Sequence, residues 1–115
     1  MTVTQLDSAR DFTGQTVAIT GGTGVLGGEM ASALACLGAN VAMLDRNVAH
    51  APALLERMGP HASRAAVIET DVLDRASLER ALDGLISRFG RVDALINAAG
   101  GNHPKATTDA NAAFF

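Results

Sequence analysis

Four short runs of apolar residues divide the chain. They cover residues 16–20 (TVAIT), 41–45 (VAMLD), 65–71 (AAVIETD) and 92–98 (VDALINA), and β-branched or aliphatic residues predominate in each. Apolar residues fill these runs nearly throughout, without the alternation typical of a strand that has one face in water. The pattern predicts strands of a parallel sheet whose two faces are both covered.

The segments between these runs have the period of helices. In the last of them, apolar residues recur three and four positions apart and form one stripe about 100° wide. The stripe consists of Leu78, Ala81, Leu82, Leu85, Ile86 and Phe89. Asp74 precedes the segment as a candidate N-cap, and Gly90 follows it as a stop signal. We expect the two earlier helices over about residues 25–37 and 48–58, each ended by a glycine.

The alternation of strands and helices predicts an α/β fold. Parallel strands joined by helices are connected by right-handed crossovers, and the doubly wound arrangement then gives the strand order 3-2-1-4. We therefore predict a Rossmann-type parallel sheet with helices on both faces, incomplete because it stops at the fourth strand. Residues 101–115 follow neither period and are predicted to form an irregular tail.

Glycines are concentrated where the first strand would meet the first helix, in the sequence TGGTGVLGG of residues 20–28. The free N–H groups and the positive dipole at a helix N-terminus bind anions, and side chains at the turn would block a phosphate. Residues 22–27 match the pattern G-x-G-x-x-G in the strand-to-helix context that it requires. This context favours binding of a nucleotide pyrophosphate. The alternative is that the glycines only make a tight turn.

Asp45 ends the second apolar run, 18 residues after Gly27. In dinucleotide-binding folds an acidic residue ~20 positions past the glycines accepts a hydrogen bond from the adenosine ribose, and we assign Asp45 to this role. Its carboxylate would repel a 2′-phosphate, which favours NAD as the cofactor. Arg46 could offset this repulsion by pairing with a phosphate, or it could be a solvated loop charge, so NADP stays an alternative.

The composition argues against several classes of function. The chain has 115 residues and a formal net charge of −3, without the basic stripe that nucleic-acid binding needs. No run approaches the ~18 apolar residues of a membrane span, and the N-terminus lacks a signal-peptide pattern, so we predict a cytoplasmic protein. We expect the single cysteine, Cys36, to be buried in the first helix. His50 and His61 lack metal-ligand spacing, and no metal site is predicted.

Three motifs together resemble the short-chain dehydrogenase/reductase family. They are TGGTGVLG at residues 20–27, the pair Asp71-Val72, and INAAG at residues 96–100. The resemblance implies a cofactor site formed by the glycine loop, by residues that hold the adenine, and by residues at the end of the fourth strand. Besides Asp45 and Arg46, the implied cofactor-binding residues are Gly21, Thr23, Gly24, Val25, Leu26, Gly27, Asp71, Val72, Asn97, Ala98, Ala99 and Gly100.

The stretch INAAGGNHPKATTD, residues 96–109, narrows the resemblance to a branch of the family described as D-mannonate oxidoreductases. This branch interconverts a keto and a hydroxy sugar acid, of the D-fructuronate/D-mannonate type. An enzyme similar to gluconate 5-dehydrogenase is the alternative. His103 and Lys105 are candidates for contacts with a substrate hydroxyl and a substrate carboxylate, although both could be ordinary exposed loop residues. The resemblance also implies a homo-oligomer, because the family's usual assembly is a tetramer.

Hydride transfer to a ketone needs an acid to protonate the developing alkoxide. The family uses a tyrosine with a nearby lysine and serine, whereas this chain has no tyrosine and a single lysine, Lys105. We therefore assign no catalytic residue. Val25 also stands where the family's commonest spacing, T-G-x-x-x-G-x-G, has its middle glycine.

We expect residues 1–115 to be the N-terminal, dinucleotide-binding portion of a longer NAD(P)-dependent oxidoreductase, inactive alone. The alternative from another functional class is a non-catalytic NAD-binding module.

Overall fold

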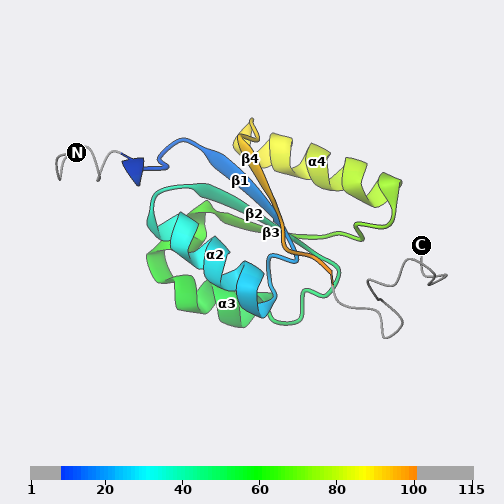
Figure 1. Ribbon diagram of the computed structural model, residues 1–115, viewed down its shortest axis with the longest axis horizontal. Helices are drawn as coiled ribbons and strands as arrows, with labels where there is room; N and C mark the ends of the chain where they lie inside the picture. The colour runs from blue at the N-terminus through cyan, green and yellow to red at the C-terminus, as the bar shows by residue number, and fades with distance from the viewer. Residues whose placement is uncertain (1–8, 101–115) are drawn as a thin grey trace, which may run out of the picture.

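The computed structural model describes residues 9–100, in which strands and helices alternate (Figure 1). The elements in chain order are β1 (Thr16–Thr20), α2 (Val25–Cys36), β2 (Asn40–Asp45), α3 (Ala51–Met58), the 3₁₀ helix η1 (Gly59–Arg64), β3 (Ala65–Glu69), α4 (Arg75–Phe89) and β4 (Ala94–Asn97). Every strand predicted from the apolar runs is present, with ends close to those expected.

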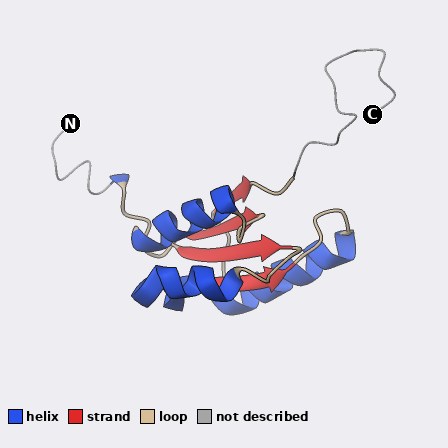
Figure 2. Cartoon of the chain, turned by 90° about the horizontal axis from the view of Figure 1, so that it is seen from below, coloured by secondary structure: helices blue, strands red, loops and turns tan. Residues whose placement is uncertain are grey.

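The sheet has four parallel strands in the order β3-β2-β1-β4, which confirms the predicted Rossmann-type arrangement. Figure 2 shows the strand arrows pointing in the same direction. In the pairing register, Ala18 of β1 lies opposite Ala42 on one side and Leu95 on the other. Because all strands run the same way, their carboxyl ends meet at one edge of the sheet. Ligands of open parallel sheets bind at such an edge.

Helices cover both faces of the sheet, as predicted. Successive side chains of a strand point to opposite faces, so β1 and β2 contribute to two separate cores. Ile19 and Met43, both fully buried, belong to the core on the side of α2 and α3. Ala18 and Leu44 belong to the core on the other side, where Leu85 of α4 is 2% exposed.

The sequence signals at the ends of α4 act as predicted. The Asp74 side chain accepts a hydrogen bond from the backbone N–H of Ala76 at 3.1 Å and so caps the first turn. Gly90 ends the helix in the left-handed region, with φ of 77°, where glycine is favoured.

Two details of the predicted helices are wrong. Helix α3 begins at Ala51 instead of residue 48, because the Asn47 side chain accepts a hydrogen bond from the Ala49 N–H at 3.0 Å and holds a turn there. Cys36, expected to be buried, is exposed at the end of α2. Its neighbour Ala35 faces the core, and adjacent helical positions point in different directions.

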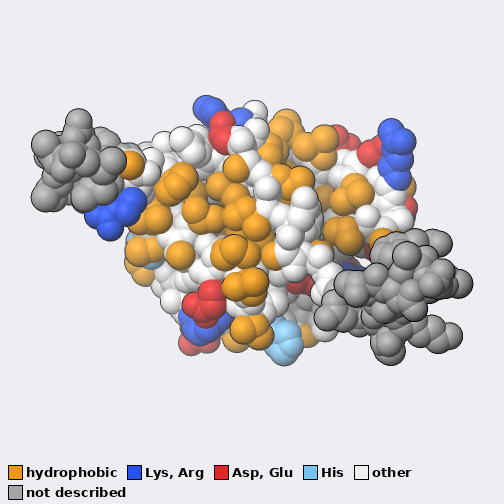
Figure 3. Space-filling view, viewed as in Figure 1, with side chains coloured by type: hydrophobic (Ala, Val, Ile, Leu, Met, Phe, Trp, Pro, Cys, Tyr) orange, Lys and Arg blue, Asp and Glu red, His pale blue; other side chains and the backbone are white. Residues whose placement is uncertain are grey.

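Strand β4 is an edge strand with an uncovered apolar surface. Leu95 is 58% exposed, and beside it on α4 Leu82 is 53% exposed. Figure 3 shows hydrophobic side chains, in orange, gathered on the visible face of the molecule. The predicted apolar stripe of α4 is therefore only partly covered within residues 9–100.

Candidate functional site

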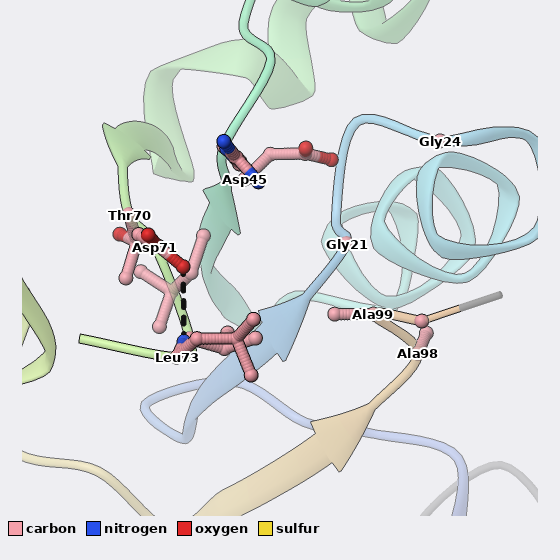
Figure 4. A pocket seen from close by; sticks show the side chains of 12 residues that line it. Gly21, Gly24, Asp45, Thr70, Asp71, Leu73, Ala98 and Ala99 are labelled. Atoms are coloured by element: carbon pink, nitrogen blue, oxygen red, sulfur yellow. Dashed lines mark hydrogen bonds between the residues drawn. The ribbon is translucent and has the colours of Figure 1, made fainter. Parts of the chain in front are cut away.

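A cavity of about 330 Å³ opens where the carboxyl ends of the strands meet at one edge of the sheet (Figure 4). It is lined by Gly21 and Gly24 and by residues 44–46, 70–73 and 98–100. The sequence-predicted residues among these are Gly21, Gly24, Asp45, Arg46, Asp71, Val72, Ala98, Ala99 and Gly100. The structure thus brings together residues from four separate parts of the chain.

The other predicted residues do not line this cavity. Val25 and Leu26, in the first turn of α2, are 92% and 70% exposed, and Thr23 and Gly27 are buried in the loop and helix. Asn97 lies in a neighbouring apolar groove with Leu95. His103 and Lys105 lie outside the described residues.

Several glycines of the loop are required by close backbone packing. Gly21 has φ of 66°, and a Cβ there would lie 2.8 Å from the Cα of Ala99. A Cβ at Gly22 would lie 2.8 Å from the Cα of Met43, and one at Gly27 would overlap the carbonyl oxygen of Gly21. These glycines let the loop pack tightly against β2, α2 and the segment after β4.

Gly24 has a different environment, at the N-cap of α2. Its φ of −72° and ψ of 178° are open to any residue, and no side chain caps the helix. The N–H groups of a first helical turn have no partner within the helix, and the helix dipole makes this end positive. The N-terminus of α2 therefore offers donors and a positive potential at the cavity wall. Val25 stands where the commonest short-chain dehydrogenase spacing has its middle glycine, and its exposed side chain takes no space in the cavity.

The Asp45 carboxylate is held at the cavity by the glycine loop. Its Oδ2 accepts hydrogen bonds from the Thr23 N–H at 3.1 Å and the Thr23 hydroxyl at 2.8 Å, and its Oδ1 accepts one from the Asn47 N–H at 3.1 Å. Desolvation by burial raises the pKa of Asp45, but these hydrogen bonds outweigh it and hold the pKa below its ordinary value. Asp45 is therefore ionised at neutral pH.

Asp71 and the two apolar residues after it form the wall contributed by the end of β3. The Asp71 N–H donates to the Ser77 hydroxyl at 2.9 Å, and Asp71 Oδ1 accepts from the Leu73 N–H at 3.0 Å (Figure 4). Val72 is 39% exposed and Leu73 is 88% exposed, so the wall offers apolar surface beside an acceptor. Sequence reasoning missed Leu73, whose only signal is its place next to the Asp71-Val72 pair.

The segment after β4 is fixed against β1 by the end residue of that strand. The Ala98 N–H donates to the Thr20 carbonyl at 3.1 Å, and the Ala99 N–H donates to the Thr20 hydroxyl at 3.2 Å. The small side chains of Ala98 and Ala99 leave the cavity open on this side.

The site combines a positive helix end, fixed carboxylates and apolar surface. This set suits an elongated ligand that carries phosphate, hydroxyl and aromatic parts. Between residues 9 and 100, no group of three or more His, Cys, Asp or Glu side chains is placed to hold a metal ion. Within the same range, no helix has the length and apolar character needed to cross a membrane.

Sequence comparisons connect the chain to known oxidoreductases. The sequence model of the family described as short chain dehydrogenase matches residues 15–115. The uncharacterized oxidoreductase UxuB of Bacillus subtilis is 46% identical over 99 residues, which cover 86% of this chain and 36% of UxuB. The D-threitol dehydrogenase of Mycolicibacterium smegmatis is 37% identical over 87 residues, which cover 76% of this chain and 34% of that protein. The chain thus spans about a third of these relatives' length.

A solved structure with bound NAD has a similar fold. It is a protein from Haemophilus influenzae, provisionally assigned as a D-mannonate oxidoreductase, with a TM-score of 0.77 and 35% sequence identity. The similarity covers 90% of this chain and 37% of that one.

Proposed function

Since the chain belongs to the short chain dehydrogenase family, as its motifs predicted, we propose that its cavity binds the adenosine diphosphate half of NAD. One observation carries this proposal. The uncapped helix N-terminus at Gly24 and the carboxylates of Asp45 and Asp71 meet in one cavity at the carboxyl edge of the sheet. Open parallel sheets bind dinucleotides at this edge.

Each part of this half of the cofactor has a matching group in the cavity. The pyrophosphate would meet the N–H groups at the start of α2, where the dipole favours negative charge. The ribose hydroxyls would donate to Asp45. The adenine would lie against Val72, with its amino group donating to Asp71. When bound, the cofactor supplies the hydride that an oxidoreductase transfers.

The ionised Asp45 favours NAD over NADP. Its carboxylate accepts hydrogen bonds from ribose hydroxyls but repels a 2′-phosphate, which carries charge of the same sign. Arg46 follows directly and is exposed at the same cavity, where it could pair with a phosphate. NADP is therefore the alternative cofactor.

For the protein as a whole, we infer an oxidoreductase that interconverts a keto and a hydroxy sugar acid. The stretch INAAGGNHPKATTD and the description of the H. influenzae structure support this substrate class. A gluconate 5-dehydrogenase-like enzyme is the second candidate. The D-threitol dehydrogenase among the relatives adds polyols to the substrates to be tested.

To these 115 residues we assign cofactor binding and no catalytic residue, because they contain no tyrosine to serve as the acid. A non-catalytic NAD-binding module is the alternative function. Homotetramer assembly and a cytoplasmic location also remain proposals.

Titration of the purified protein with NADH and NADPH, followed by the fluorescence of the reduced nicotinamide, tests the cofactor assignment. Hydrogen bonds to charged groups are worth about 1.5–3 kcal/mol, so Asp45→Ala should raise the dissociation constant for NADH about tenfold or more. NADPH should be affected much less. Equal losses for both cofactors would remove Asp45 from the ribose site. A panel of D-mannonate, D-gluconate and D-threitol with NAD then separates the candidate substrates.

A further inference from the structure

Thr23 is buried between the glycine loop and the end of β2, and it holds Asp45 through two of its own atoms. Only 7% of Thr23 is exposed. Its N–H and its hydroxyl both donate to Asp45 Oδ2, at 3.1 and 2.8 Å. The Asn47 N–H donates to the other oxygen, Oδ1, at 3.1 Å. The carboxylate is thus fixed from two directions, and Figure 4 shows it turned toward the loop between Gly21 and Gly24.

The Thr23 hydroxyl has one proton and two acceptors within reach. Asp45 Oδ2 lies 2.8 Å from Oγ1, and the carbonyl oxygen of Asn47 lies 3.0 Å from it. Hydrogen bonds to ionised acceptors are shorter and stronger than those to neutral ones. The proton is therefore directed at the Asp45 carboxylate.

Thr23 fills the acceptor positions of one oxygen of Asp45, Oδ2. An ionised carboxylate has about four acceptor positions, two on each oxygen. Thr23 supplies two donors to Oδ2, the Asn47 N–H donates to Oδ1, and the backbone N–H of Arg46 is a further donor to the carboxylate. We propose that Thr23 is a positioning residue that presents Asp45 Oδ1 to the ribose hydroxyls and thereby sets the preference for NAD over NADP. This rests on the proposed function, because it needs the ribose to lie at Asp45.

The preference for NAD over NADP depends on the position of the negative charge of Asp45. Without the Thr23 hydroxyl, the carboxylate keeps its hydrogen bonds from the Thr23 and Asn47 N–H groups but loses the shortest of the three, so it is held less firmly as an acceptor for the ribose. A less firmly held carboxylate also repels a 2′-phosphate less effectively, while the neighbouring Arg46 remains able to attract one. Loss of the hydroxyl should therefore weaken NADH binding more than NADPH binding.

Three substitutions isolate the hydroxyl of Thr23. Thr23→Val keeps the shape and the backbone N–H bond and removes only the hydroxyl, whereas Thr23→Ser keeps the hydroxyl. Thr23→Ala is a second loss variant with less bulk than valine. Thr13→Val is the matched control, because it removes another Thr-to-Asp hydrogen bond, from Thr13 to Asp11 at 2.6 Å, away from the cavity.

The measurement is the dissociation constant of the purified protein for NADH and for NADPH, by nicotinamide fluorescence. We expect Thr23→Val and Thr23→Ala to raise the NADH constant about five- to tenfold and the NADPH constant by less than about twofold. Thr23→Ser and Thr13→Val should bind both cofactors like the wild type. In the Asp45→Ala background, Thr23→Val should have no further effect on NADH, because it acts through Asp45.

Two results would overturn the proposal in different ways. One is that Thr23→Val weakens the binding of NADH and NADPH equally. Another is that Thr23→Val weakens NADH binding by the same factor in the Asp45→Ala background as in the wild type. Either outcome would show that Thr23 acts on the loop and not through Asp45. The NAD site would then still stand, provided that Asp45→Ala weakens NADH selectively. If Asp45→Ala does not change the ratio of the two constants, the ribose assignment fails, and the role of Thr23 fails with it.

Discussion

Replacing Gly24 by alanine should separate the folding of the glycine loop from its ligand binding. The backbone angles of Gly24 are open to alanine, and a Cβ would lie 3.3 Å from the Gly21 carbonyl oxygen, a tight contact that a small shift relieves. Alanine is a poorer N-cap than glycine, which costs about 0.5–1 kcal/mol. We therefore expect the free energy of unfolding to fall by only about 1 kcal/mol.

The same methyl group should have a larger effect on NADH. It would stand at the cavity wall, where the pyrophosphate approaches the first N–H groups of α2. Loss of one charge-assisted hydrogen bond costs about 1.5–3 kcal/mol, so the dissociation constant should rise about tenfold or more. Urea unfolding and NADH fluorescence titration measure the two effects on one preparation. Gly27→Ala is the contrasting control, because its Cβ would overlap the Gly21 carbonyl and should impair folding itself. A folded Gly24→Ala variant with unchanged NADH affinity would show that the phosphates do not approach at Gly24.

Two further predictions concern stability. Leu85→Ala should lower the free energy of unfolding by about 2–4 kcal/mol, and Leu82→Ala should lower it by less than about 1 kcal/mol. The reason is that Leu85 is 2% exposed, whereas Leu82 is 53% exposed. Urea unfolding measures both effects, and similar losses for the two variants would contradict the packing of α4. The Arg91 side chain and the Thr16 N–H hold the pKa of Asp93 below its ordinary value. The stability that Asp93 contributes is therefore present at neutral pH and lost as the pH falls below about 4, so the advantage of the wild type over Asp93→Asn should shrink between pH 7 and pH 3. An advantage that stays constant would rule out this coupling.

The sheet could be predicted from the sequence because its signals are local. The apolar runs mark strands covered on both faces, and the crossover rule gives their order. Asp74 and Gly90 mark the ends of α4 through bonds and backbone angles formed within a few residues. Asp45 and Asp71 stand at the ends of predicted strands, so the sequence also predicts that both carboxylates lie at one edge of the sheet.

Features that depend on contacts between distant residues could not be predicted. The hydrogen bonds of Thr23 join residues 22 positions apart, and no motif specifies them. The helix η1 follows a Gly-Pro pair that the sequence indicates only as a stop, and Arg64 within it donates to the Ala35 carbonyl of α2. The exposure of Cys36 could not be predicted, because α2 is rich in small apolar residues and its pattern does not define a buried face clearly.

The most direct test of the central claim is a crystal structure of the purified protein with NAD. We expect the adenosine in the cavity between Asp45 and Val72, with a ribose hydroxyl about 2.6–3.2 Å from an Asp45 oxygen and the pyrophosphate at the start of α2. Density for NAD at another place, or a ribose that makes no hydrogen bond to Asp45, would contradict the proposed site.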